Sequence, residues 1–258
     1  MDFKLTNKCA FISAAGRGIG RSIAKCLARE GASLIVNSRT KEDLESLLGE
    51  LKDFTKHKIF CADLTDSENI KKLIQFFQIH NMIPDIIVHN LGGNLSITDP
   101  LCSVEEWRRV QRINLEIPIE INRLIIPHMR KKKWGRICHT ASIAGLENQG
   151  PPSYCAAKAA LIAYTRSVGR FVAKDGIVMN TILPGAVFTE GGYWDKMSNN
   201  NPEHVEKYLN ERMAIQRFGT PEEISEVVAF LCSDLASFCI GSAFLVDGGQ
   251  GRAFYSQE

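Results

Sequence analysis

The sequence lacks the features that would place it in several specialised classes of protein. Its 258 residues contain no run of about 20 apolar residues, so no segment is expected to span a bilayer as a helix. Residues 1–8 lack the apolar core of a signal peptide. The formal net charge is only +2, which is too small to imply nucleic acid or an acidic membrane as a partner. We therefore expect a soluble cytoplasmic protein that binds neither nucleic acid nor membrane.

The cysteines and histidines do not have the spacing of a disulfide framework or a metal site. The eight cysteines include no C-x-x-C pair, and several, such as Cys9, lie inside apolar runs. Cysteines of this kind are typically small buried side chains that remain reduced in the cytosol. The six histidines are scattered, so we expect no bound metal. A chain of this length can bury enough apolar surface to fold without such cross-links.

What the sequence does contain is an alternation of short apolar runs with longer amphipathic stretches. The runs that we predict to be strands are residues 9–12, 34–36, 58–61, 86–88, 137–138, 177–183 and 244–246. The stretches with helical spacing are residues 19–29, 41–51, 67–79, 104–130, 153–174 and 221–232. Strands that are apolar on both faces and separated by helices predict a parallel sheet covered on both sides. We therefore predict a single α/β domain over residues 1–258: a Rossmann-type doubly wound sheet of about seven parallel strands with helices on both faces.

Residues 189–213 break this alternation. The segment is polar, contains Gly-Gly-Tyr-Trp at residues 191–194, and follows the end of a predicted strand. Long excursions in such positions are often lids or binding loops. We predict a substrate lid here, and the alternative is a tolerated surface insertion.

A glycine-rich loop follows the first predicted strand. Residues 13–20 are Ser-Ala-Ala-Gly-Arg-Gly-Ile-Gly, and a helical stretch begins directly afterwards. Glycines let the backbone approach a pyrophosphate closely, and a helix N-terminus offers it free N–H groups. The loop resembles the T-G-x-x-x-G-x-G loop of the short-chain dehydrogenase/reductase family, which Gly18 and Gly20 match. Ser13 and Ala14 replace the threonine and the first glycine, so Ala14 must adopt a φ angle suited to the loop.

The end of the second predicted strand bears on which dinucleotide is bound. An NAD enzyme usually has Asp or Glu there to accept a hydrogen bond from the ribose 2′-hydroxyl, but residues 34–40 contain no carboxylate. Arg39 can instead make a forked, charged contact with a 2′-phosphate, and Arg17 adds a second positive charge. We therefore predict NADP(H) rather than NAD(H). The alternative is that Arg39 is a solvated residue in a turn.

Tyr154 and Lys158 form a Y-x-x-x-K pattern. The i, i+4 spacing places both side chains on one helical face, so that the ammonium lies near the phenol. Free tyrosine titrates at about pH 10 and lysine at about 10.4, so neither alone suits proton transfer at neutral pH. A nearby cation lowers the pKa of a phenol, which would make Tyr154 a usable acid or base. The alternative for this common pattern is an ordinary exposed helical pair.

The surroundings of this pair also resemble the same family. Residues 140–145 resemble its strand-five motif, with the serine at Ser142, whose hydroxyl is expected to bond the substrate oxygen. The separation between Ser142 and Tyr154 is one residue shorter than in the family, so we expect a rearranged loop between these two residues. The resemblance also assigns to Asn114 a proton relay in which its backbone carbonyl connects through a water to Lys158. The implied catalytic set is Asn114, Ser142, Tyr154 and Lys158.

The resemblance further implies a set of cofactor contacts at the ends of the predicted strands. Asp63 occupies the place where the family contacts the adenine edge, and residues 90–93 resemble its N-A-G segment. Residues 184–189 resemble P-G-x-x-x-T, which implies that Val187 and Thr189 hold the nicotinamide carboxamide. The complete expected set is Ser13, Ala15, Arg17, Gly18, Ile19, Gly20, Ser38, Arg39, Asp63, Leu64, Asn90, Gly92, Tyr154, Lys158, Pro184, Gly185, Val187 and Thr189. Residues 217–224 and 240–249 also match the family, so the resemblance spans residues 5–250.

The activity implied by the resemblance is NADP(H)-dependent hydride transfer between a carbonyl and a secondary alcohol, with Tyr154 moving the proton. The chain looks most like the 3-oxoacyl-(acyl-carrier-protein) reductase branch, and the basic residues 130–133 would suit an acidic carrier protein. Those cations would equally complement a helix dipole. Asp175 departs from the basic residue expected in that branch. The polar residues 191–194 instead suit a sugar, an amino sugar or another small hydroxylated metabolite.

Two other classes of protein are weighed against this one. A non-catalytic dinucleotide-binding sensor would share the fold but would not need Ser142, Tyr154 and Lys158 together. A sugar-nucleotide epimerase or dehydratase also uses Y-x-x-x-K, but it usually has a larger C-terminal substrate domain. The resemblance also implies a homotetramer or homodimer packed through the long helices and the C-terminal segment.

Overall fold

The computed structural model describes residues 3–147 and 149–252. In these residues one sheet has the strand order β3-β2-β1-β4-β5-β6-β7, and every neighbouring pair is parallel. The strands are β1 (Cys9–Ile12), β2 (Ser33–Ser38), β3 (Lys58–Cys61), β4 (Ile86–His89), β5 (Gly135–Thr140), β6 (Ile177–Pro184) and β7 (Ala243–Val246). The predicted Rossmann-type sheet of seven parallel strands is confirmed.

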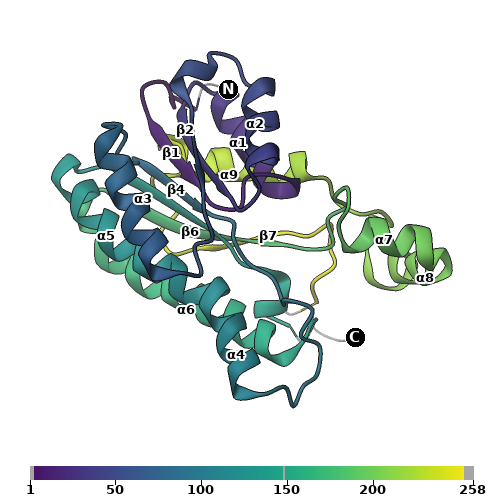
Figure 1. The fold of residues 1–258 in the computed structure, drawn as a ribbon. Helices are drawn as coiled ribbons and strands as arrows, with labels where there is room; N and C mark the ends of the chain where they lie inside the picture. The colour runs from purple at the N-terminus through teal and green to yellow at the C-terminus, as the bar shows by residue number, and fades with distance from the viewer. Residues whose placement is uncertain (1–2, 148, 253–258) are drawn as a thin grey trace.

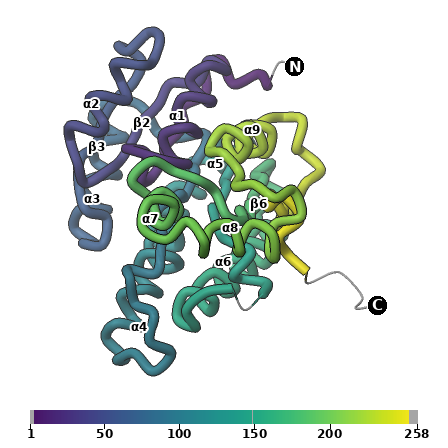
Figure 2. Tube along the Cα trace, turned by 90° about the vertical axis from the view of Figure 1, so that its right-hand side faces the viewer, coloured from purple at the N-terminus to yellow at the C-terminus, as the bar shows by residue number. Residues whose placement is uncertain are grey.

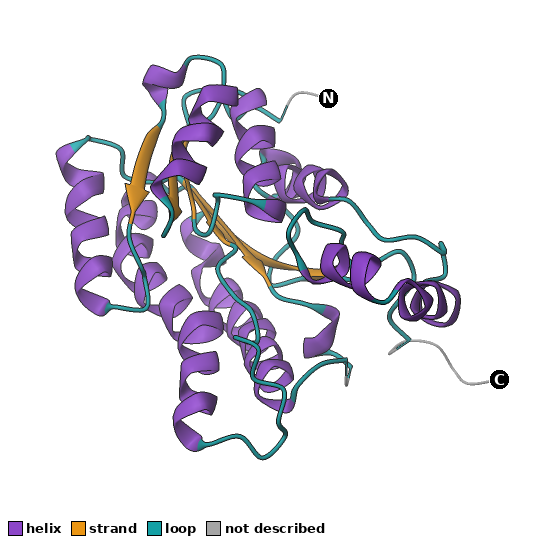
Figure 3. Cartoon of the chain, turned by 45° about the vertical axis from the view of Figure 1, so that its right-hand side comes forward, coloured by secondary structure: helices purple, strands orange, loops and turns teal. Residues whose placement is uncertain are grey.

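Helices cover both faces of the sheet (Figures 1 and 3). One face packs against α1 (Gly18–Arg29), α2 (Lys41–Glu50) and α9 (Pro221–Leu231). The other face packs against α3 (Ser67–Ile79), α5 (Ile117–Lys132) and α6 (Pro152–Val172). Short 3-10 turns are η1 (Phe54–Lys56), η3 (Ile143–Gly145), η4 (Ala173–Asp175) and η5 (Asp234–Ala236). This two-sided cover explains why β1, β4, β5 and β6 are buried along their whole length.

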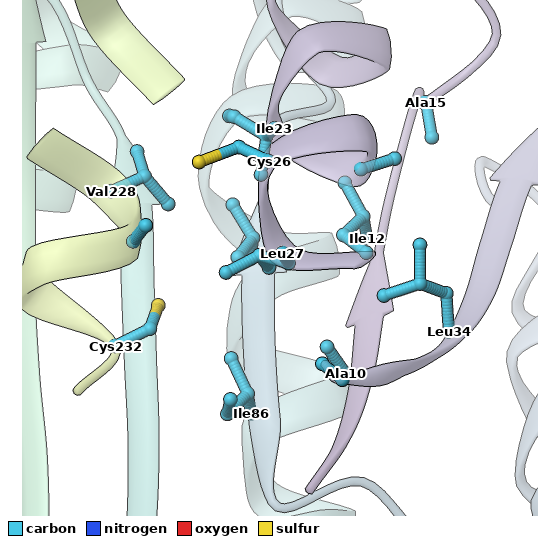
Figure 4. Packing of buried hydrophobic residues seen from close by; sticks show 14 of the residues in the cluster. Ala10, Ile12, Ala15, Ile23, Cys26, Leu27, Leu34, Ile86, Val228 and Cys232 are labelled. Atoms are coloured by element: carbon cyan, nitrogen blue, oxygen red, sulfur yellow. The ribbon is translucent and has the colours of Figure 1, made fainter. Parts of the chain in front are cut away.

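The core between α1, α9 and the sheet is made of aliphatic side chains and cysteine thiols (Figure 4). Leu27 of α1 and Val228 of α9 are both fully buried in one cluster with Ile12 and Ile86 of the central strands. Cys26 and Cys232 are buried in the same cluster as free thiols. This packing fixes α1, and with it the loop that precedes α1, against the sheet.

The stretch predicted as one helix over residues 104–130 is divided in the structure. It consists of α4 (Val104–Gln111), a π-helical turn η2 (Arg112–Glu116) and α5. Pro118 lies at the start of α5, where its missing N–H costs little, and Pro127 lies inside it. The wider π turn occurs at Asn114, one of the predicted catalytic residues. Such turns within helices are often found at functional sites.

The predicted lid, residues 189–213, is mostly helical. It contains α7 (Tyr193–Asn200) and α8 (Pro202–Arg212), and neither helix has a buried residue. Figure 2 shows the two helices in front of the strand ends, between the α1 and α9 side and the α4 and α6 side. Asn201 ends α7 and caps α8 through its side chain, which accepts a hydrogen bond from the His204 N–H. Among the described residues, no helix is both long and apolar enough to cross a bilayer.

Candidate active site

A cleft of about 650 Å³ runs along the carboxyl ends of the strands, beside the point where the strand order reverses between β1 and β4. Ligands of open α/β sheets bind at such a reversal. Most of the predicted cofactor contacts line this cleft: Arg17, Gly18, Ile19, Ser38, Arg39, Asp63, Leu64, Asn90, Gly92, Tyr154, Lys158, Pro184, Gly185, Val187 and Thr189. The catalytic candidate Ser142 also lines it.

Three predicted cofactor contacts, Ser13, Ala15 and Gly20, lie behind the cleft lining. Ser13 and Ala15 are buried, and Ala15 donates its N–H to the Asn37 carbonyl. A Cβ on Gly20 would lie 2.2 Å from the Ala14 carbonyl oxygen, so this glycine permits close packing of helix and loop. Sequence spacing could not separate residues that face the cleft from residues that support the loop from behind.

The loop before α1 presents its backbone to the cleft. Ala14 has φ +51° and Gly18 has φ +54°, so both lie in the left-handed region, which costs alanine about 1–2 kcal/mol. The N-cap residue Arg17 makes no side-chain cap, and this leaves the first N–H groups of α1 available to a ligand. A helix N-terminus with free N–H groups favours an anion such as a pyrophosphate.

The side chain of Ser13 ties this loop to the end of β4. Its Oγ accepts hydrogen bonds from the N–H groups of Asn90 and Leu91, each at 3.0 Å. The Asn90 amide in turn donates to the Ala14 carbonyl at 3.2 Å. Ser13 and Ala14, which replace the family's threonine and first glycine, therefore still join the end of β1 to the end of β4.

Charged side chains gather at the end of the cleft that contains Ser38, Arg39 and Asp63, where the nucleotide is expected to bind. We call this the nucleotide end. Arg39 is largely exposed, and its Nη1 lies 3.8 Å from the Asp63 carboxylate. Burial opposes the ionisation of Asp63, but hydrogen bonds from Thr65 and the nearby Arg39 cation outweigh it and lower the pKa of Asp63. An exposed ion pair of this kind is worth little, so Arg39 can exchange it for another anion at low cost. Asp43, which the sequence did not single out, also lines this end.

At the other end of the cleft, Tyr154 and Lys158 lie on one face of α6. The Lys158 Nζ is 5.6 Å from the centre of the Tyr154 ring and donates a 2.7 Å hydrogen bond to the Thr140 carbonyl. Burial lowers the pKa of Lys158 to about 7. Burial raises the pKa of Tyr154, and a hydrogen bond with Ser142 acts in the opposite direction. The Ser142 hydroxyl thus acts on the phenol directly, whereas the Lys158 amine lies over its ring and is bonded to Thr140.

The predicted lowering of the Tyr154 pKa by Lys158 does not appear in this arrangement. The ammonium is directed to the Thr140 carbonyl at the end of β5, and loss of solvation has the largest effect on both groups. Desolvation disfavours the charged form of each group, so it raises the pKa of the phenol and lowers that of the amine. The i, i+4 spacing brought the two residues together, but it could not reveal how deeply each is buried.

Asn114 is buried at the π turn and joins α4 to the loop after β4. Its side-chain oxygen accepts from the Gly93 N–H at 3.0 Å, and its amide donates to the Gly93 and Val110 carbonyls, each at 2.8 Å. A Cβ on Gly92 would lie 2.6 Å from the Asn114 oxygen and 2.9 Å from the Lys158 Nζ. Asn114, Gly92 and Lys158 therefore lie close together, as a relay between Asn114 and Lys158 would require.

A buried histidine pair beneath the site was not singled out from the sequence. His89 of β4 and His139 of β5 are opposite each other in the sheet, and their rings stack at 4.9 Å. Asn122 lies between them, 2.8 Å from His89 Nε2 and 3.1 Å from His139 Nε2. Burial lowers the pKa of His89 to about 4 and that of His139 well below its usual range. The pair is therefore uncharged at neutral pH and supports the strand ends that bear Asn90 and Thr140.

The lid contributes Trp194 to the cleft lining, beside Gly191 and Gly192. Its ring centre lies 4.3 Å from that of Tyr208 and 4.6 Å from that of Phe218. The sequence marked this segment as polar with aromatics but could not show which aromatic faces the cleft. Within residues 3–147 and 149–252, no three His, Cys, Asp or Glu side chains group as metal ligands.

Comparison with known proteins identifies the family. A family model described as enoyl-(acyl carrier protein) reductase matches residues 13–250, which is most of the chain. The chain belongs to the short-chain dehydrogenase/reductase family. Like other enzymes of this family, it is an oxidoreductase that interconverts alcohols and carbonyls.

Relatives of this dehydrogenase/reductase differ in their substrates. The 3-oxoacyl-(acyl-carrier-protein) reductase FabG of Aquifex aeolicus is 31% identical over 254 residues, which cover 96% of this chain and 99% of the relative. The crystal structure of L-sorbose reductase from Gluconobacter frateurii, complexed with NADPH and L-sorbose, is 28% identical. It matches with a TM-score of 0.89 over 97% of this chain and 98% of its own.

A third relative was solved with the other nicotinamide dinucleotide. The structure of 7α-hydroxysteroid dehydrogenase complexed with NADH and 7-oxo-glycochenodeoxycholic acid is 27% identical. It matches with a TM-score of 0.88 over 97% of this chain and 96% of its own. Both dinucleotides are therefore found among the structural relatives of this dehydrogenase/reductase.

Proposed function

We propose that this protein is an NADP(H)-dependent reductase that converts a carbonyl into a secondary alcohol, or the reverse, with Tyr154 as the proton donor or acceptor. The observation that supports this most strongly is the meeting of three groups from two elements. Ser142 at the end of β5 hydrogen-bonds the phenol of Tyr154, and Lys158 lies one helical turn further along α6. All three line one cleft. A non-catalytic sensor would not need these groups together.

The cleft fits a dinucleotide. The free N–H groups at the start of α1 and the left-handed Gly18 suit a pyrophosphate. A Cβ on Gly18 would lie 3.2 Å from Thr189, so the glycine keeps the loop open toward the P-G-x-x-x-T segment. Val187 and Thr189, from that segment, would hold the nicotinamide end, and the bound nicotinamide supplies or accepts the hydride.

The protein's own residues handle the substrate oxygen and its proton. Ser142 donates a hydrogen bond to the carbonyl oxygen, which stabilises the negative charge that develops there. Tyr154 gives its proton to that oxygen during reduction and takes it back during oxidation. When protonated, Lys158, whose Nζ lies 5.6 Å from the centre of the Tyr154 ring, would favour the phenolate as it forms. Asn114 holds the loop containing Gly92 and Gly93 against Lys158, and we propose that its backbone carbonyl serves the proton relay.

The choice of NADP(H) over NAD(H) is supported by Arg39, Ser38 and Arg17, which line the nucleotide end of the cleft. An exposed guanidinium there suits a 2′-phosphate, and β2 ends without a carboxylate. The neighbouring Asp63 is already paired with Arg39. L-sorbose reductase, which was solved with NADPH, is a structural relative of this chain.

For the substrate, we propose a 3-oxoacyl thioester, because a 3-oxoacyl-(acyl-carrier-protein) reductase matches nearly the whole chain. A carrier protein as partner has less support, because two cations of the basic run are paired within the chain. Arg130 lies 2.7 Å from Asp175, and Lys132 lies 2.6 Å from Asp85. We therefore expect the thioester to bind with or without its carrier.

A second substrate class, a sugar or another small hydroxylated metabolite, is favoured by the lid. Trp194 faces the cleft, and an aromatic ring beside polar glycine backbone suits the mixed surface of a polyol. Assays of NADPH oxidation with acetoacetyl thioesters and with keto-sugars distinguish the two classes. The eight free thiols suit a reducing compartment, which supports a cytoplasmic location.

The proposal is tested by Tyr154→Phe, which removes only the phenolic hydroxyl. We expect kcat to fall by several orders of magnitude while NADPH binding, followed by nucleotide fluorescence, is retained. Tyr193→Phe, at an exposed tyrosine of the lid, is the matched control and should keep its turnover. Near-normal turnover of the Tyr154 variant would remove this mechanism.

A further inference from the structure

The side chain of Gln250, near the C-terminal end of the described chain, joins three segments around the cleft. It is only 4% exposed. Its Oε1 accepts a hydrogen bond from the Ala186 N–H at 2.7 Å. Its Nε2 donates to the Gln149 Oε1 at 2.9 Å and to the Tyr208 hydroxyl at 2.5 Å. The hydrogen bonds of this buried amide are therefore directed to three separate segments of the chain.

Each of these three partners belongs to a part of the candidate site. Ala186 lies between Gly185 and Val187, which line the cleft. Gln149 lies in the loop between Ser142 and Tyr154. Tyr208 belongs to α8 of the lid. One side chain thus connects the cofactor segment, the loop that leads to the catalytic tyrosine, and the lid.

The residues after Gln250 repeat two of these connections. The backbone N–H of Arg252 donates to Glu147, in the same loop as Gln149. The Arg252 guanidinium donates to the Glu211 carbonyl of α8 at 2.9 Å. Residues 250–252 therefore link the lid to the loop before Tyr154 at two places.

Apart from the packing of Trp194 and Tyr208 against Phe218, the lid has few buried contacts. Neither α7 nor α8 contains a buried residue. A cavity of about 380 Å³ lies between α8 and the β5–α6 loop, lined by Gln149, Tyr208 and Arg212 among others. Segments with few buried contacts open at low free-energy cost, so single hydrogen bonds weigh heavily there.

Tyr208 connects this hydrogen-bond group to the cleft. Its ring packs 4.3 Å from that of Trp194, which lines the cleft together with Tyr154. Displacing Tyr208 would therefore displace the aromatic wall that faces the reacting end. Gly185 leaves room for the side chain of Gln250, since a Cβ at position 185 would lie 2.6 Å from the Gln250 Oε1.

We propose that Gln250 is a positioning residue for the substrate: through Tyr208 it holds the lid, with Trp194, closed over the cleft, and through Gln149 it aligns the loop before Tyr154. This inference rests on the proposed reductase function of the same cleft. The lid then governs how long the substrate stays beside Ser142 and Tyr154. The nucleotide end of the cleft, at Arg39, is independent of it.

The test uses Gln250→Met in the full chain, because methionine matches the shape of glutamine without its hydrogen bonds. We expect amide hydrogen exchange in residues 193–212 and at Gln149, Gly150 and Ser153 to rise about tenfold or more, since the hydrogen bonds to the lid and loop are lost. We expect KM for the carbonyl substrate to rise by a similar factor, while kcat and the Kd for NADPH change less, because only the single hydrogen bond to the Ala186 N–H reaches the cofactor segment. Tyr208→Phe, which keeps the ring packed against Trp194, should change the same two quantities in the same direction by a smaller factor.

Gln75→Met, at an exposed glutamine of α3, is the matched control and should alter neither exchange nor KM. A variant of Gln250 whose lid exchanges at the wild-type rate would overturn the proposal, as would one with a lower Tm and an unchanged KM. If the wild-type protein reduces no carbonyl at all, the proposed function fails. The exchange measurement still decides whether Gln250 holds the lid.

Discussion

At the residue scale, the nucleotide end of the cleft depends on Arg39, whose side chain is 76% exposed and weakly paired with Asp63. We expect Arg39→Gln to raise KM for NADPH about tenfold or more and to leave KM for NADH nearly unchanged. The reason is the loss of a charged hydrogen bond to the 2′-phosphate. Steady-state kinetics with both nucleotides measure the effect. Arg123→Gln on α5 is the control, and equal losses with both nucleotides would contradict a role for Arg39 in selectivity.

Burial of Lys158 makes a prediction about stability and pH. Its pKa falls to about 7 in the folded protein, whereas a lysine in the unfolded chain titrates at about 10.4. Between these two pH values the unfolded state binds more protons, so this residue makes the folded state more stable as the pH rises. Below pH 7 the buried amine is charged, and its full desolvation cost opposes folding.

We therefore expect Lys158→Met to be inactive yet more stable than the wild type, by a few kcal/mol at pH 6. This advantage should shrink steadily between pH 7 and pH 10. Urea unfolding at several pH values measures it. An advantage that is constant with pH would show that Lys158 is not the titrating group.

At the scale of single elements, two glycines in helices have opposite roles. A Cβ on Gly20 of α1 would lie 2.2 Å from the Ala14 carbonyl oxygen and 2.6 Å from the Asn90 amide. A Cβ on Gly49 of α2 would meet no atom within 4 Å, and this glycine is exposed. The first glycine is required by packing, whereas the second only weakens its helix.

We expect Gly20→Ala to lower the free energy of unfolding by about 1–3 kcal/mol and to weaken NADPH binding, because the loop must move away from α1. Gly49→Ala should raise that free energy by about 0.5–1 kcal/mol, since alanine favours the helix. Chemical denaturation and nucleotide titration measure both variants. Stabilisation by Gly20→Ala would show that the loop is not held against α1 as described.

At the scale of the whole molecule, the edge of the sheet at β7 exposes apolar side chains. Leu245 of β7 is 41% exposed, and in the segment that leads to β7 Leu235 is 49% and Phe238 99% exposed. Large exposed apolar side chains at and before an edge strand indicate an interface. We expect the chain to form a homotetramer, or a homodimer, in which this edge is covered.

Phe238→Asp should therefore shift the protein toward smaller species in light scattering, because a carboxylate cannot be buried there without a partner. Phe54→Asp is the control, since Phe54 is 67% exposed on η1, away from β7. A wild-type protein that is monomeric at every concentration would contradict the assembly.

Short-range patterns along the chain were enough to predict the order of the seven strands and most of the helices, and to pair Tyr154 with Lys158. Apolar runs separated by amphipathic stretches favour a covered parallel sheet, because each strand must bury both faces. The i, i+4 spacing put Tyr154 and Lys158 on one face of α6, because a helix fixes neighbours at that distance. The glycine loop placed a turn with free N–H groups directly before α1. These features depend on residues close together in the chain.

How deeply those residues are buried, and what lies against them, became evident only in the folded molecule. The direction of the pKa shifts at Tyr154 and Lys158 follows from desolvation by several elements, which no spacing reveals. The π turn at Asn114 and the contact of Gln250 with Tyr208 likewise depend on segments far apart in sequence. Local patterns are set by neighbouring residues, whereas burial and hydrogen-bond partners are set by the packing of distant ones.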